Sequence, residues 1–250
     1  MSGKAMSTLS VLLLTQNQAA RLPRLLTCVS GFANEVVIVD GGSTDDTAEV
    51  AGRFPKVRRA QRDFDGNFAA QRNFALDHAQ GDWVLFLDTD ELPGPNLVEL
   101  LPTLMRSRFT SFKIPRYWLV DEDPAEYVDS ELHYPDRQMR LFRRLPELRY
   151  DEAQPVHETI PKQARGELFP LKFAHLLHYQ FLWEDRSARE TRVKRYEELR
   201  PGVMRTNRMY LYEDIPHQVR PCREYWQSNK PIITSGDQLR EKLRMKLPRL

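Results

Sequence analysis

The sequence of 250 residues is 41% hydrophobic and 29% charged, with a formal net charge of +2. This composition suits a folded domain with its own core, excludes a disordered chain, and gives no reason to expect a nucleic-acid partner. Two cysteines, Cys28 and Cys222, are too few for a disulfide framework or a structural zinc site. The apolar run near the N-terminus is too short for a secretory signal or a membrane span, which favours a cytoplasmic protein.

The first part of the chain alternates strand and helix patterns. Short apolar runs predict strands, and apolar residues at helical spacing between them predict helices. Strands joined by helices of this length imply right-handed crossovers and a mostly parallel sheet between two helical layers. The predicted strands are 9–15, 35–40, 57–61 and 83–87, and the predicted helices are 19–30, a segment after the glycines at 41–42, and 67–80.

The pattern changes after Leu92. A helix is predicted from Pro95 to Arg106, and a charged helix is predicted over 184–199. Between them, short alternating segments are typical of antiparallel strands. These segments are 111–120, 137–144 and 156–160.

Polar residues follow three of the predicted buried strands, at 15–17, 40–43 and 88–90. In an open parallel sheet, ligands bind beyond the carboxyl ends of the strands. Asp40 can accept a hydrogen bond from a base or a ribose there, although an Asp before Gly-Gly is also a common turn former.

Asp88 and Asp90 are two residues apart, which on an extended strand places both on one side and turns Glu91 away. Mg²⁺ and Mn²⁺ prefer oxygen ligands, commonly one or two carboxylates together with substrate phosphates. A cation held in this way neutralises a diphosphate leaving group. The alternative is an acidic strand end that remains in solvent.

Several motifs in chain order carry a family resemblance. The segments "SVLLLTQNQAARLPRLL", "EVVIVDGGSTDDT" and "QRNFALDHAQGDWVLFLDTDE" resemble the inverting nucleotide-sugar glycosyltransferases of family two, over residues 9 to about 105. "FDGNFAAQRNFALDHA" and "YPDRQMRLFRR…VHE" more particularly resemble bacterial lipopolysaccharide-core transferases. The resemblance implies the GT-A fold, an α/β, Rossmann-like three-layer sandwich with a mostly parallel central sheet and an antiparallel acceptor-side extension.

The resemblance also implies roles for single residues. Arg72 would face the diphosphate and ribose, as a guanidinium fork suits phosphate oxygens, although a solvated helix arginine is the alternative. Asp88 and Asp90, with His178, would hold Mg²⁺ or Mn²⁺ as the cofactor. The residues expected to bind the nucleotide sugar are Thr15, Asn17, Asp40, Ser43, Arg72, Asp88 and Thr89.

An inverting transferase needs a general base to deprotonate the acceptor hydroxyl. Family members place a carboxylate base well after the metal motif, and several place a histidine ligand some twenty residues beyond that base. Glu158 and His178 match this spacing, so Glu158 is the predicted catalytic base. The rival metal ligands are His157 and His175, and the alternative bases are Asp136 and Asp151.

Aromatic and basic residues of the second half leave further alternatives. Trp118, Tyr134 and Trp183 can stack on a sugar face or simply pack in the core. The arginines of 137–144 can hold an anionic acceptor such as a phosphorylated core sugar. On a regular strand, however, Arg137 faces away from Arg140 and Arg144, so Arg137, Arg140, Arg143 and Arg144 cannot all serve one site.

The predicted function is a metal-dependent inverting glycosyltransferase. It would move a sugar from a nucleoside diphosphate donor, with a UDP-sugar favoured, to a hydroxyl of a cell-envelope glycan or glycolipid. Residues 1–105 would be the nucleotide-sugar-binding half, 106–200 the acceptor and catalytic half of the same domain, and 201–250 a basic C-terminal extension. The alternatives are a non-catalytic nucleotide-sugar-binding protein and a haloacid-dehalogenase-type phosphatase, whose motif has Thr or Val where Leu92 stands.

The charge of the chain is concentrated near its C-terminal end. Residues 185–250 contain 16 Lys and Arg against 9 Asp and Glu. A basic region of this kind is either a solvated surface or a peripheral contact with an anionic membrane.

Overall fold

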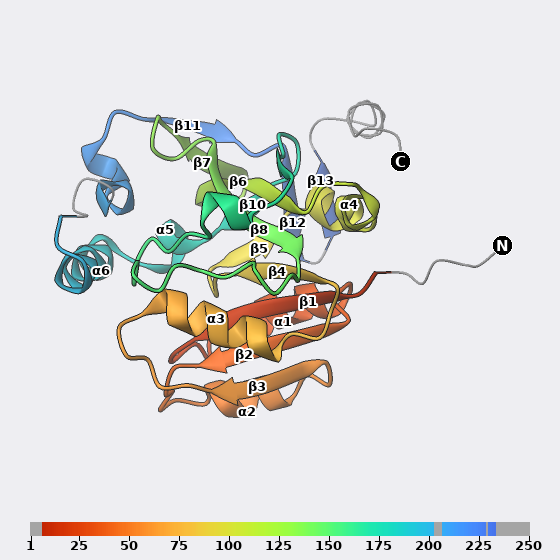
Figure 1. The fold of residues 1–250 in the computed structure, drawn as a ribbon. Helices are drawn as coiled ribbons and strands as arrows, with labels where there is room; N and C mark the ends of the chain where they lie inside the picture. Colours follow the sequence, from red (N-terminus) through yellow and green to blue (C-terminus); the bar gives the residue numbers. More distant parts are fainter. Residues whose placement is uncertain (1–6, 203–206, 229, 234–250) are drawn as a thin grey trace.

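The computed structural model describes residues 7–202, 207–228 and 230–233. One large sheet dominates the fold (Figure 1), with the main order β11-β7-β6-β8-β4-β1-β2-β3. The strands β3, β2, β1 and β4 are parallel, whereas β8, β6, β7 and β11 extend the sheet with antiparallel pairs. These strands are β1 (Leu9–Thr15), β2 (Glu35–Asp40), β3 (Val57–Gln61), β4 (Trp83–Leu87), β6 (Ser111–Glu122), β7 (Ala125–Asp129), β8 (Asp136–Arg143) and β11 (Gln218–Pro221).

Short strands complete the sheet beside β6 and form a separate hairpin. β10 lies between β5 and β6, and β9 pairs with the start of β6. β12 and β13 pair only with each other and lie beside α4. Their bounds are β5 (Glu91–Pro93), β9 (Leu168–Pro170), β10 (Leu176–His178), β12 (Glu224–Gln227) and β13 (Lys230–Ile233).

Helices cover both faces of the parallel part of the sheet. Alternate residues of a strand point to opposite faces; accordingly, Val11 and Leu13 pack in one apolar cluster and Leu12 in the other. The first cluster contains residues of α1 and α2, and the second contains residues of α3, which lies in front of the sheet in Figure 1. The helices are α1 (Leu22–Ser30), α2 (Thr47–Gly52), α3 (Phe68–His78), α4 (Pro95–Arg106), α5 (Gln180–Trp183) and α6 (Arg186–Leu199), with short 3-10 turns η1 (Lys162–Ala164), η2 (Arg208–Tyr210) and η3 (Tyr212–Asp214).

The helices α3 and α6 each begin at a residue whose side chain caps the first turn. The Asn67 side chain accepts a hydrogen bond from the backbone N–H of Ala70 at 3.0 Å and caps α3. The Asp185 side chain caps α6 in the same way through Ala188, at 2.8 Å. Such caps satisfy N–H groups that the first helical turn leaves unpaired, so both helices begin at defined positions.

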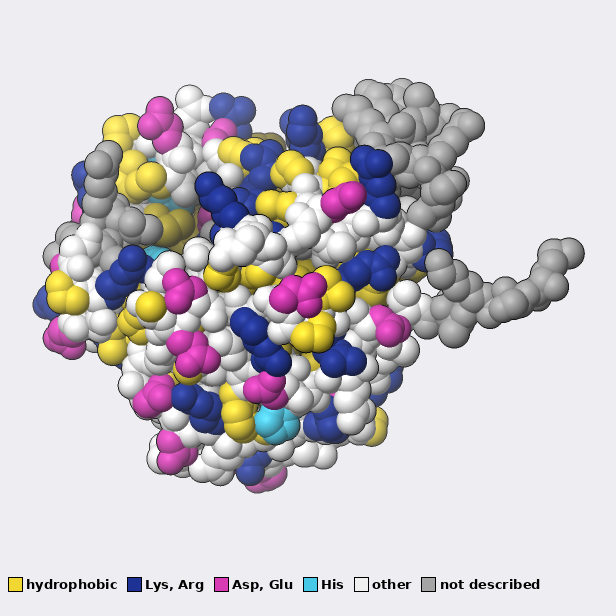
Figure 2. Space-filling model, in the orientation of Figure 1, with side chains coloured by type: hydrophobic (Ala, Val, Ile, Leu, Met, Phe, Trp, Pro, Cys, Tyr) yellow, Lys and Arg dark blue, Asp and Glu magenta, His cyan; other side chains and the backbone are white. Residues whose placement is uncertain are grey.

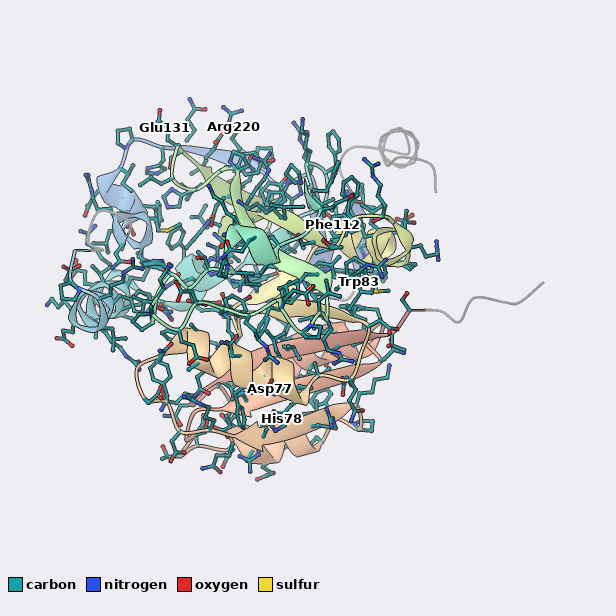
Figure 3. All side chains as sticks on the ribbon, in the orientation of Figure 1. Asp77, His78, Trp83, Phe112, Glu131 and Arg220 are labelled. Atoms are coloured by element: carbon teal, nitrogen blue, oxygen red, sulfur yellow. The ribbon has the colours of Figure 1, made fainter. Side chains whose placement is uncertain are left out.

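The parallel and antiparallel parts of the sheet share one core. Trp83 of β4 and Phe112 of β6 stack with ring centroids 5.9 Å apart (Figure 3). Both side chains are fully buried. Burial of two rings of this size stabilises the junction of the two parts, because the gain scales with the apolar area removed from water.

Most predicted elements are confirmed, including the exact bounds of β1, β2, β3, β4 and α4. The predicted strand at 156–160 is wrong, because this segment has no regular secondary structure. In the region after residue 200, β11 joins the edge of the large sheet. Residues 203–206, 229 and 234–250 of the predicted basic extension lie outside the described residues, which contain no helix that is long and apolar enough to cross a membrane.

Candidate active site

A cavity of about 1010 Å³ lies at the carboxyl ends of β1 and β4 and extends over β8 and β6. Its walls come from segments far apart in the sequence, including α3, the loop before η1, and α6. The position agrees with the general location of ligand sites in open parallel sheets. The predicted site residues that line the cavity are Thr15, Arg72, Asp88, Thr89, Asp90, Glu158 and His178.

Three further residues were predicted to bind the nucleotide sugar. Asn17, Asp40 and Ser43 lie in the loops after β1 and β2, beside the cavity. Oδ1 of Asp40 accepts hydrogen bonds from the backbone N–H groups of Gly42 and Ser43, at 3.1 and 2.8 Å. The backbone N–H of Asn17 donates to Oγ of Ser43 at 2.9 Å. Gly42 has φ of 93°, a conformation that favours glycine. These contacts hold the two strand-end loops together, and Thr15, at the end of β1, faces the cavity with a buried Oγ1 that has no partner among the described residues.

Side chains of alternating charge run through the base of the cavity. They come from α3, β4–β5, β6, β8 and the irregular segment 151–160. Each arginine in the series contacts two carboxylates. In order, the series is Glu158, Arg72, Asp88, Arg140, Glu91, Arg116 and Asp136.

Arg72 connects the predicted base to the predicted metal motif. Its Nη2 lies 2.9 Å from Oδ1 of Asp88, and its Nε donates to Oε1 of Glu158. The guanidinium also lies over the ring of Phe86, 4.7 Å from its centroid. Nη1 of Arg72 is buried without a hydrogen-bond partner among the described residues. Arg72 is therefore positioned between two acidic groups and has one donor nitrogen left over.

Asp88 is held by arginines, whereas Asp90 is not. Burial alone would raise the pKa of Asp88, but the guanidinium groups of Arg140 and Arg72 outweigh burial and hold that pKa well below its ordinary value. Asp90 instead lies against His178, with 3.5 Å between Oδ1 and Nε2. Burial would also raise the pKa of Asp90, but the nearby His178 outweighs it and lowers the pKa to about 2. Both carboxylates are therefore ionised at neutral pH.

Local strand pairing brings His178 to Asp90. β10 is antiparallel to β5, with His178 opposite Glu91. The backbone N–H of Tyr179 donates to the carbonyl oxygen of Asp90 at 2.8 Å. Nδ1 of His178 is buried and has no partner among the described residues. The imidazole thus presents Nε2 to Asp90 on the wall of the cavity.

Asp90 and His178 form a pair with donor atoms suited to a divalent cation. In the described part of the chain, no group of three or more His, Cys, Asp or Glu side chains is arranged to hold a metal ion. A protein pair completed by substrate phosphates is nevertheless a common arrangement for Mg²⁺ and Mn²⁺. Nε2 of His178 and Asp90, which accepts no hydrogen bond from an arginine among the described residues, fit this arrangement better than Asp88, whose two oxygens both accept from arginine.

The rival histidines occupy other environments. His175 is buried, with Nδ1 2.7 Å from Oε1 of Glu224, and its ring stacks on Tyr117. It does not line the cavity. His157 does line it, but its Nε2 lies 2.9 Å from Oδ1 of Asn207.

The alternative bases are also engaged elsewhere. Asp151 does not line the cavity, and its carboxylate accepts from the backbone of Ala153 and the side chain of Gln154. Asp136 lines the cavity, but its Oδ2 accepts from Nε of Arg116 at 2.7 Å and from Trp118 at 3.1 Å. Burial would raise the pKa of Asp136, yet Arg116 outweighs burial and lowers it. Oδ1 of Asp136 accepts from Nε2 of Gln138 at 2.6 Å, so both oxygens of this carboxylate are already engaged.

Glu158 lies on the cavity wall with 12% of its side chain exposed. The preceding residue, His157, has φ of 53°, and the sharp backbone turn there replaces the predicted strand. Oε1 accepts from Arg72, while Oε2 accepts no hydrogen bond from the residues that the structure describes. Glu158 therefore keeps one oxygen available for a substrate group.

Glu91 does not line the cavity, in agreement with the expectation that it turns away from Asp88 and Asp90, but it supports the turn that carries them. The strand β4 ends at Leu87, so the simple alternation does not continue to Glu91. Glu91 is fully buried; its Oε1 accepts from Arg116 at 3.0 Å and Arg140 at 2.9 Å, and its Oε2 accepts from the backbone N–H of Asp88 at 3.0 Å. It holds the turn that carries both Asp88 and Asp90.

A β-bulge explains the position of Arg140. Phe112 of β6 pairs with Leu141 and Lys113 pairs with Met139, which leaves Arg140 as an extra residue in β8. Bulges redirect side chains, and here Arg137 and Arg140 line the same cavity. The expectation that they face opposite ways was therefore wrong.

The other two arginines of the segment lie outside the cavity. Arg143 covers the Trp83 ring, and Arg144 donates to the carbonyl of Gly81.

The aromatic residues considered for stacking on a sugar instead pack against other side chains. Trp118 is buried, with its ring 4.1 Å from that of His178, centroid to centroid. Tyr134 stacks on Tyr117, and Trp183 stacks on Tyr179. None of Trp118, Tyr134 and Trp183 is among the described residues that line the cavity.

α6 contributes a cation that the sequence did not single out. Arg192 lines the cavity, donates to Glu184, and lies 3.4 Å from the hydroxyl of Tyr196 through Nη1. Burial would lower the pKa of Arg192, but the surrounding Tyr196, Asp90 and Glu184 outweigh it and raise the pKa. The charged helix pattern gave no sign of which arginine faces inward.

Comparisons with known proteins agree with this architecture. Residues 10–160 match the family described as Glycosyl transferase family 2, which is more than half of the chain. The lipopolysaccharide core biosynthesis glycosyltransferase LpsC of Rhizobium meliloti is 32% identical over 186 residues, covering 71% of this chain and 65% of that protein. A TPR repeat-containing protein of Synechococcus elongatus is 30% identical over 158 residues, covering 63% of this chain and 36% of that protein. The chain therefore spans only part of the length of these relatives.

Solved structures share the fold at low sequence identity. TarS of S. aureus superposes with a TM-score of 0.53 at 17% identity, covering 82% of this chain and 42% of TarS. The mannosyltransferase PcManGT of Pyrobaculum calidifontis gives a TM-score of 0.54 at 16% identity, covering 86% and 67%. The fold is the GT-A fold of these glycosyltransferases. The chain belongs to glycosyl transferase family 2.

Proposed function

We propose that the protein is a metal-dependent inverting glycosyltransferase that uses a nucleoside diphosphate sugar as donor. One observation carries the proposal: the Asp90–His178 pair and Glu158 line one cavity, with Arg72 and Asp88 between them. Family membership supports glycosyl transfer as the reaction class. The proposal goes beyond the reaction class in three respects: inversion at the anomeric carbon, the use of a metal ion, and the class of acceptor.

The donor would occupy the side of the cavity formed by the ends of β1 and β4. Thr15 offers an unpartnered hydroxyl there, and the Asp40 loop fixes the backbone around it. The PcManGT structure contains GDP-Man and Mn²⁺, and a TarS structure with a TM-score of 0.50 contains UDP, which supports a nucleotide-sugar donor. We propose a UDP-sugar as the favoured donor, and expect Arg72 and Arg192 to face the diphosphate because both guanidinium groups lie at this end.

Asp90 and His178 would hold Mg²⁺ or Mn²⁺, with donor phosphates as further ligands. The chemistry supplied by the bound cation is neutralisation of the charge that develops on the diphosphate leaving group. Asp88 would contribute through its position, because two arginines and the backbone contact to Glu91 fix it beside Asp90.

Glu158 would act as the general base. Its Oε2 would accept the proton of the acceptor hydroxyl while the hydroxyl oxygen attacks the anomeric carbon and the nucleoside diphosphate leaves from the opposite face. Arg72 holds Oε1 and so orients the carboxylate.

The acceptor would be a hydroxyl of a cell-envelope glycan or glycolipid. The resemblance to LpsC, a lipopolysaccharide core biosynthesis glycosyltransferase, supports this class. Peripheral membrane contact through the basic C-terminal region stays a prediction, and residues 203–206, 229 and 234–250 of that region lie outside the described residues.

A donor-hydrolysis screen tests the proposal without knowledge of the acceptor. The purified protein is incubated with UDP-, GDP-, dTDP- and ADP-sugars in Mn²⁺, Mg²⁺ or EDTA, and release of the nucleoside diphosphate is measured. We expect release from one nucleotide class, with UDP favoured, and none in EDTA. No binding and no release with any donor would contradict the proposal.

The screen also separates the second candidate, a non-catalytic nucleotide-sugar-binding protein. Such a protein would bind a donor in the presence of metal but would release no product, and Glu158→Gln would change nothing. The haloacid-dehalogenase-type phosphatase is set aside because the chain belongs to glycosyl transferase family 2.

A further inference from the structure

The lysine and arginine side chains that line the cavity differ in how fully they are neutralised. Arg72, Arg116 and Arg140 are each neutralised by two carboxylates, as described above. Arg21 and Arg192 share the carboxylate of Glu184. Arg195 of α6 has no ion-pair partner among the described residues, and its guanidinium lies over the ring of Phe64. Lys113, Arg137 and Arg165 also line the cavity, and the described residues provide no ion-pair partner for any of these three either. We call Lys113, Arg137 and Arg165 the cationic wall.

The acids nearest to the cationic wall in the sequence are already paired. Asp136, beside Arg137, binds Arg116, and Glu167 lies 3.7 Å from Arg108. The carboxylates that line the cavity are likewise paired with cations: Asp88 and Glu158 with Arg72, Asp90 with His178, Asp136 with Arg116, and Glu184 with Arg192. The positive charge of the wall is therefore not balanced within the described part of the chain.

Strand pairing places Lys113 and Arg137 on one face of the β6–β8 pair, and a hydrogen bond places the backbone of Arg165 beside β6. Lys113 pairs with Met139 and Pro115 pairs with Arg137, so Lys113 and Arg137 are diagonal neighbours on the same face. The carbonyl oxygen of Arg165 accepts from the hydroxyl of Ser111 at 2.9 Å, two residues before Lys113. All three side chains are half-buried. Figure 2 shows the side chains of one face of the molecule coloured by type.

The wall lies across the Asp88–Asp90 turn from the donor end. In the sheet order, β1 and β2 lie on one side of β4, whereas β8 and β6 lie on the other. The donor residues Thr15 and Asp40 end β1 and β2, and the wall belongs to β6, β8 and the segment before β9. A ligand in contact with the wall would therefore approach the site from the side opposite the nucleotide.

We propose that the cationic wall binds an anionic group, a phosphate monoester or a carboxylate, carried by the saccharide acceptor. The inference rests on the proposed transferase function. A half-buried site with three unpaired cations attracts an anion strongly, because burial weakens the screening of charge by water. Arg137 can bind such a group with two parallel hydrogen bonds, and Lys113 adds a point charge beside it. The acceptor hydroxyl near Glu158 would then belong to a sugar fixed by its charged substituent.

Binding of small saccharides tests this inference directly. The protein is first saturated with UDP and Mn²⁺, so that the donor end is filled. Glucose 6-phosphate, glucuronate, neutral glucose and inorganic phosphate are then titrated separately by calorimetry or ligand-detected NMR. We expect one of the anionic saccharides to bind at least about tenfold more tightly than glucose and than inorganic phosphate, since one charge-assisted contact is worth about that factor. The phosphate and carboxylate arms identify which anion the wall prefers.

Matched variants assign the preference to the wall. Lys113→Gln combined with Arg137→Gln should reduce the preference over glucose by about tenfold or more. Exchange of the two cations, Lys113→Arg with Arg137→Lys, should preserve the preference for the anionic saccharide. This result would show that the preference depends on the positive charge of the wall. Arg144→Gln is the control, because Arg144 is exposed in the same segment and does not line the cavity. Thermal unfolding of each variant verifies that it is folded.

Two results would overturn the inference: equal binding of neutral and anionic saccharides to the UDP-saturated protein, or a preference that survives loss of both cations. Donor hydrolysis by the unmodified protein is measured in parallel. If hydrolysis occurs without any anion preference, the inference is wrong and the proposed function stands. If no donor is bound or hydrolysed, the proposed function is wrong, and the anion preference shows only a saccharide site.

Discussion

Replacement of Glu91 by Gln should destabilise the protein strongly. Glu91 is fully buried, and its Oε1 accepts hydrogen bonds from two arginines. Glu91→Gln keeps the size of the side chain but removes the negative charge between Arg116 and Arg140. In addition, an amide NH₂ replaces Oε2, which accepts from the backbone N–H of Asp88, so two donors would face each other.

The magnitude follows from these contacts. Removing one partner of a buried ion pair costs about 3–5 kcal/mol, because it leaves uncompensated buried charge. Asp88 and Asp136 still compensate Arg140 and Arg116 in part, so we take the lower end, about 3 kcal/mol. In a protein of this size, each kcal/mol lowers Tm by about 2–4 °C, which predicts a fall of about 6–12 °C.

Urea unfolding at pH 7, followed by circular dichroism, measures the effect. The matched control is Glu131→Gln, because Glu131 is exposed in the loop after β7 (Figure 3) and should change the free energy of unfolding by less than about 0.5 kcal/mol. A loss below about 1 kcal/mol for Glu91→Gln would refute the reasoning. It would mean that the arginines do not depend on Glu91 for compensation.

Two further predictions concern the base and a thiol. Glu158→Gln should lower sugar transfer by at least about 100-fold, the usual contribution of a general base, while UDP binding measured by calorimetry changes less than about twofold; full transfer activity would exclude Glu158 as the base. Burial raises the pKa of the Cys28 thiol to about 11, so the thiol stays protonated at pH 8. Iodoacetamide should therefore modify Cys28 slowly in the folded protein, faster as the pH rises toward 11, and rapidly in urea. Mass spectrometry follows the reaction, and equal rates with and without urea at pH 8 would contradict the assignment.

The parallel half of the fold was predictable because its signals are local. Runs such as 83–87 are buried on both faces and bounded by turn residues, and the observed β4 has the predicted bounds. The same holds for α4, which begins at Pro95 as predicted. A proline at the first helical position has no N–H to leave unpaired, so the sequence marks that start directly.

The second half was less predictable because its geometry depends on long-range contacts. The segment 156–160 alternates like a strand, yet it is irregular, and it brings Glu158 to Arg72 across 86 positions of sequence. The bulge at Arg140 depends on the pairing of β8 with β6, which no local pattern reveals. The ion pairs of Glu91 with Arg116 and Arg140 were not predictable for a related reason, since these arginines come from β6 and β8.

The candidate site was predictable where a motif and a strand end coincide. Asp88, Asp90 and Thr15 line the cavity because they directly follow or end buried strands of the parallel sheet. Arg116 and Arg192 gave no such signal. They are buried cations, and only the fold shows which carboxylates compensate them.

The central claim is that Asp90, with His178, supports metal-dependent use of a nucleotide sugar. The most direct measurement is donor hydrolysis in Mn²⁺ by the unmodified protein, Asp90→Asn and Asp77→Asn. Asp77 is a matched control, because it lies on the outer side of α3 (Figure 3), where it pairs with Arg149 at 2.6 Å and does not line the cavity. We expect hydrolysis by the unmodified protein and by Asp77→Asn, none in EDTA, and a loss of at least about 100-fold for Asp90→Asn. Equal hydrolysis by Asp90→Asn, or hydrolysis that is indifferent to Mn²⁺ and EDTA, would contradict the claim.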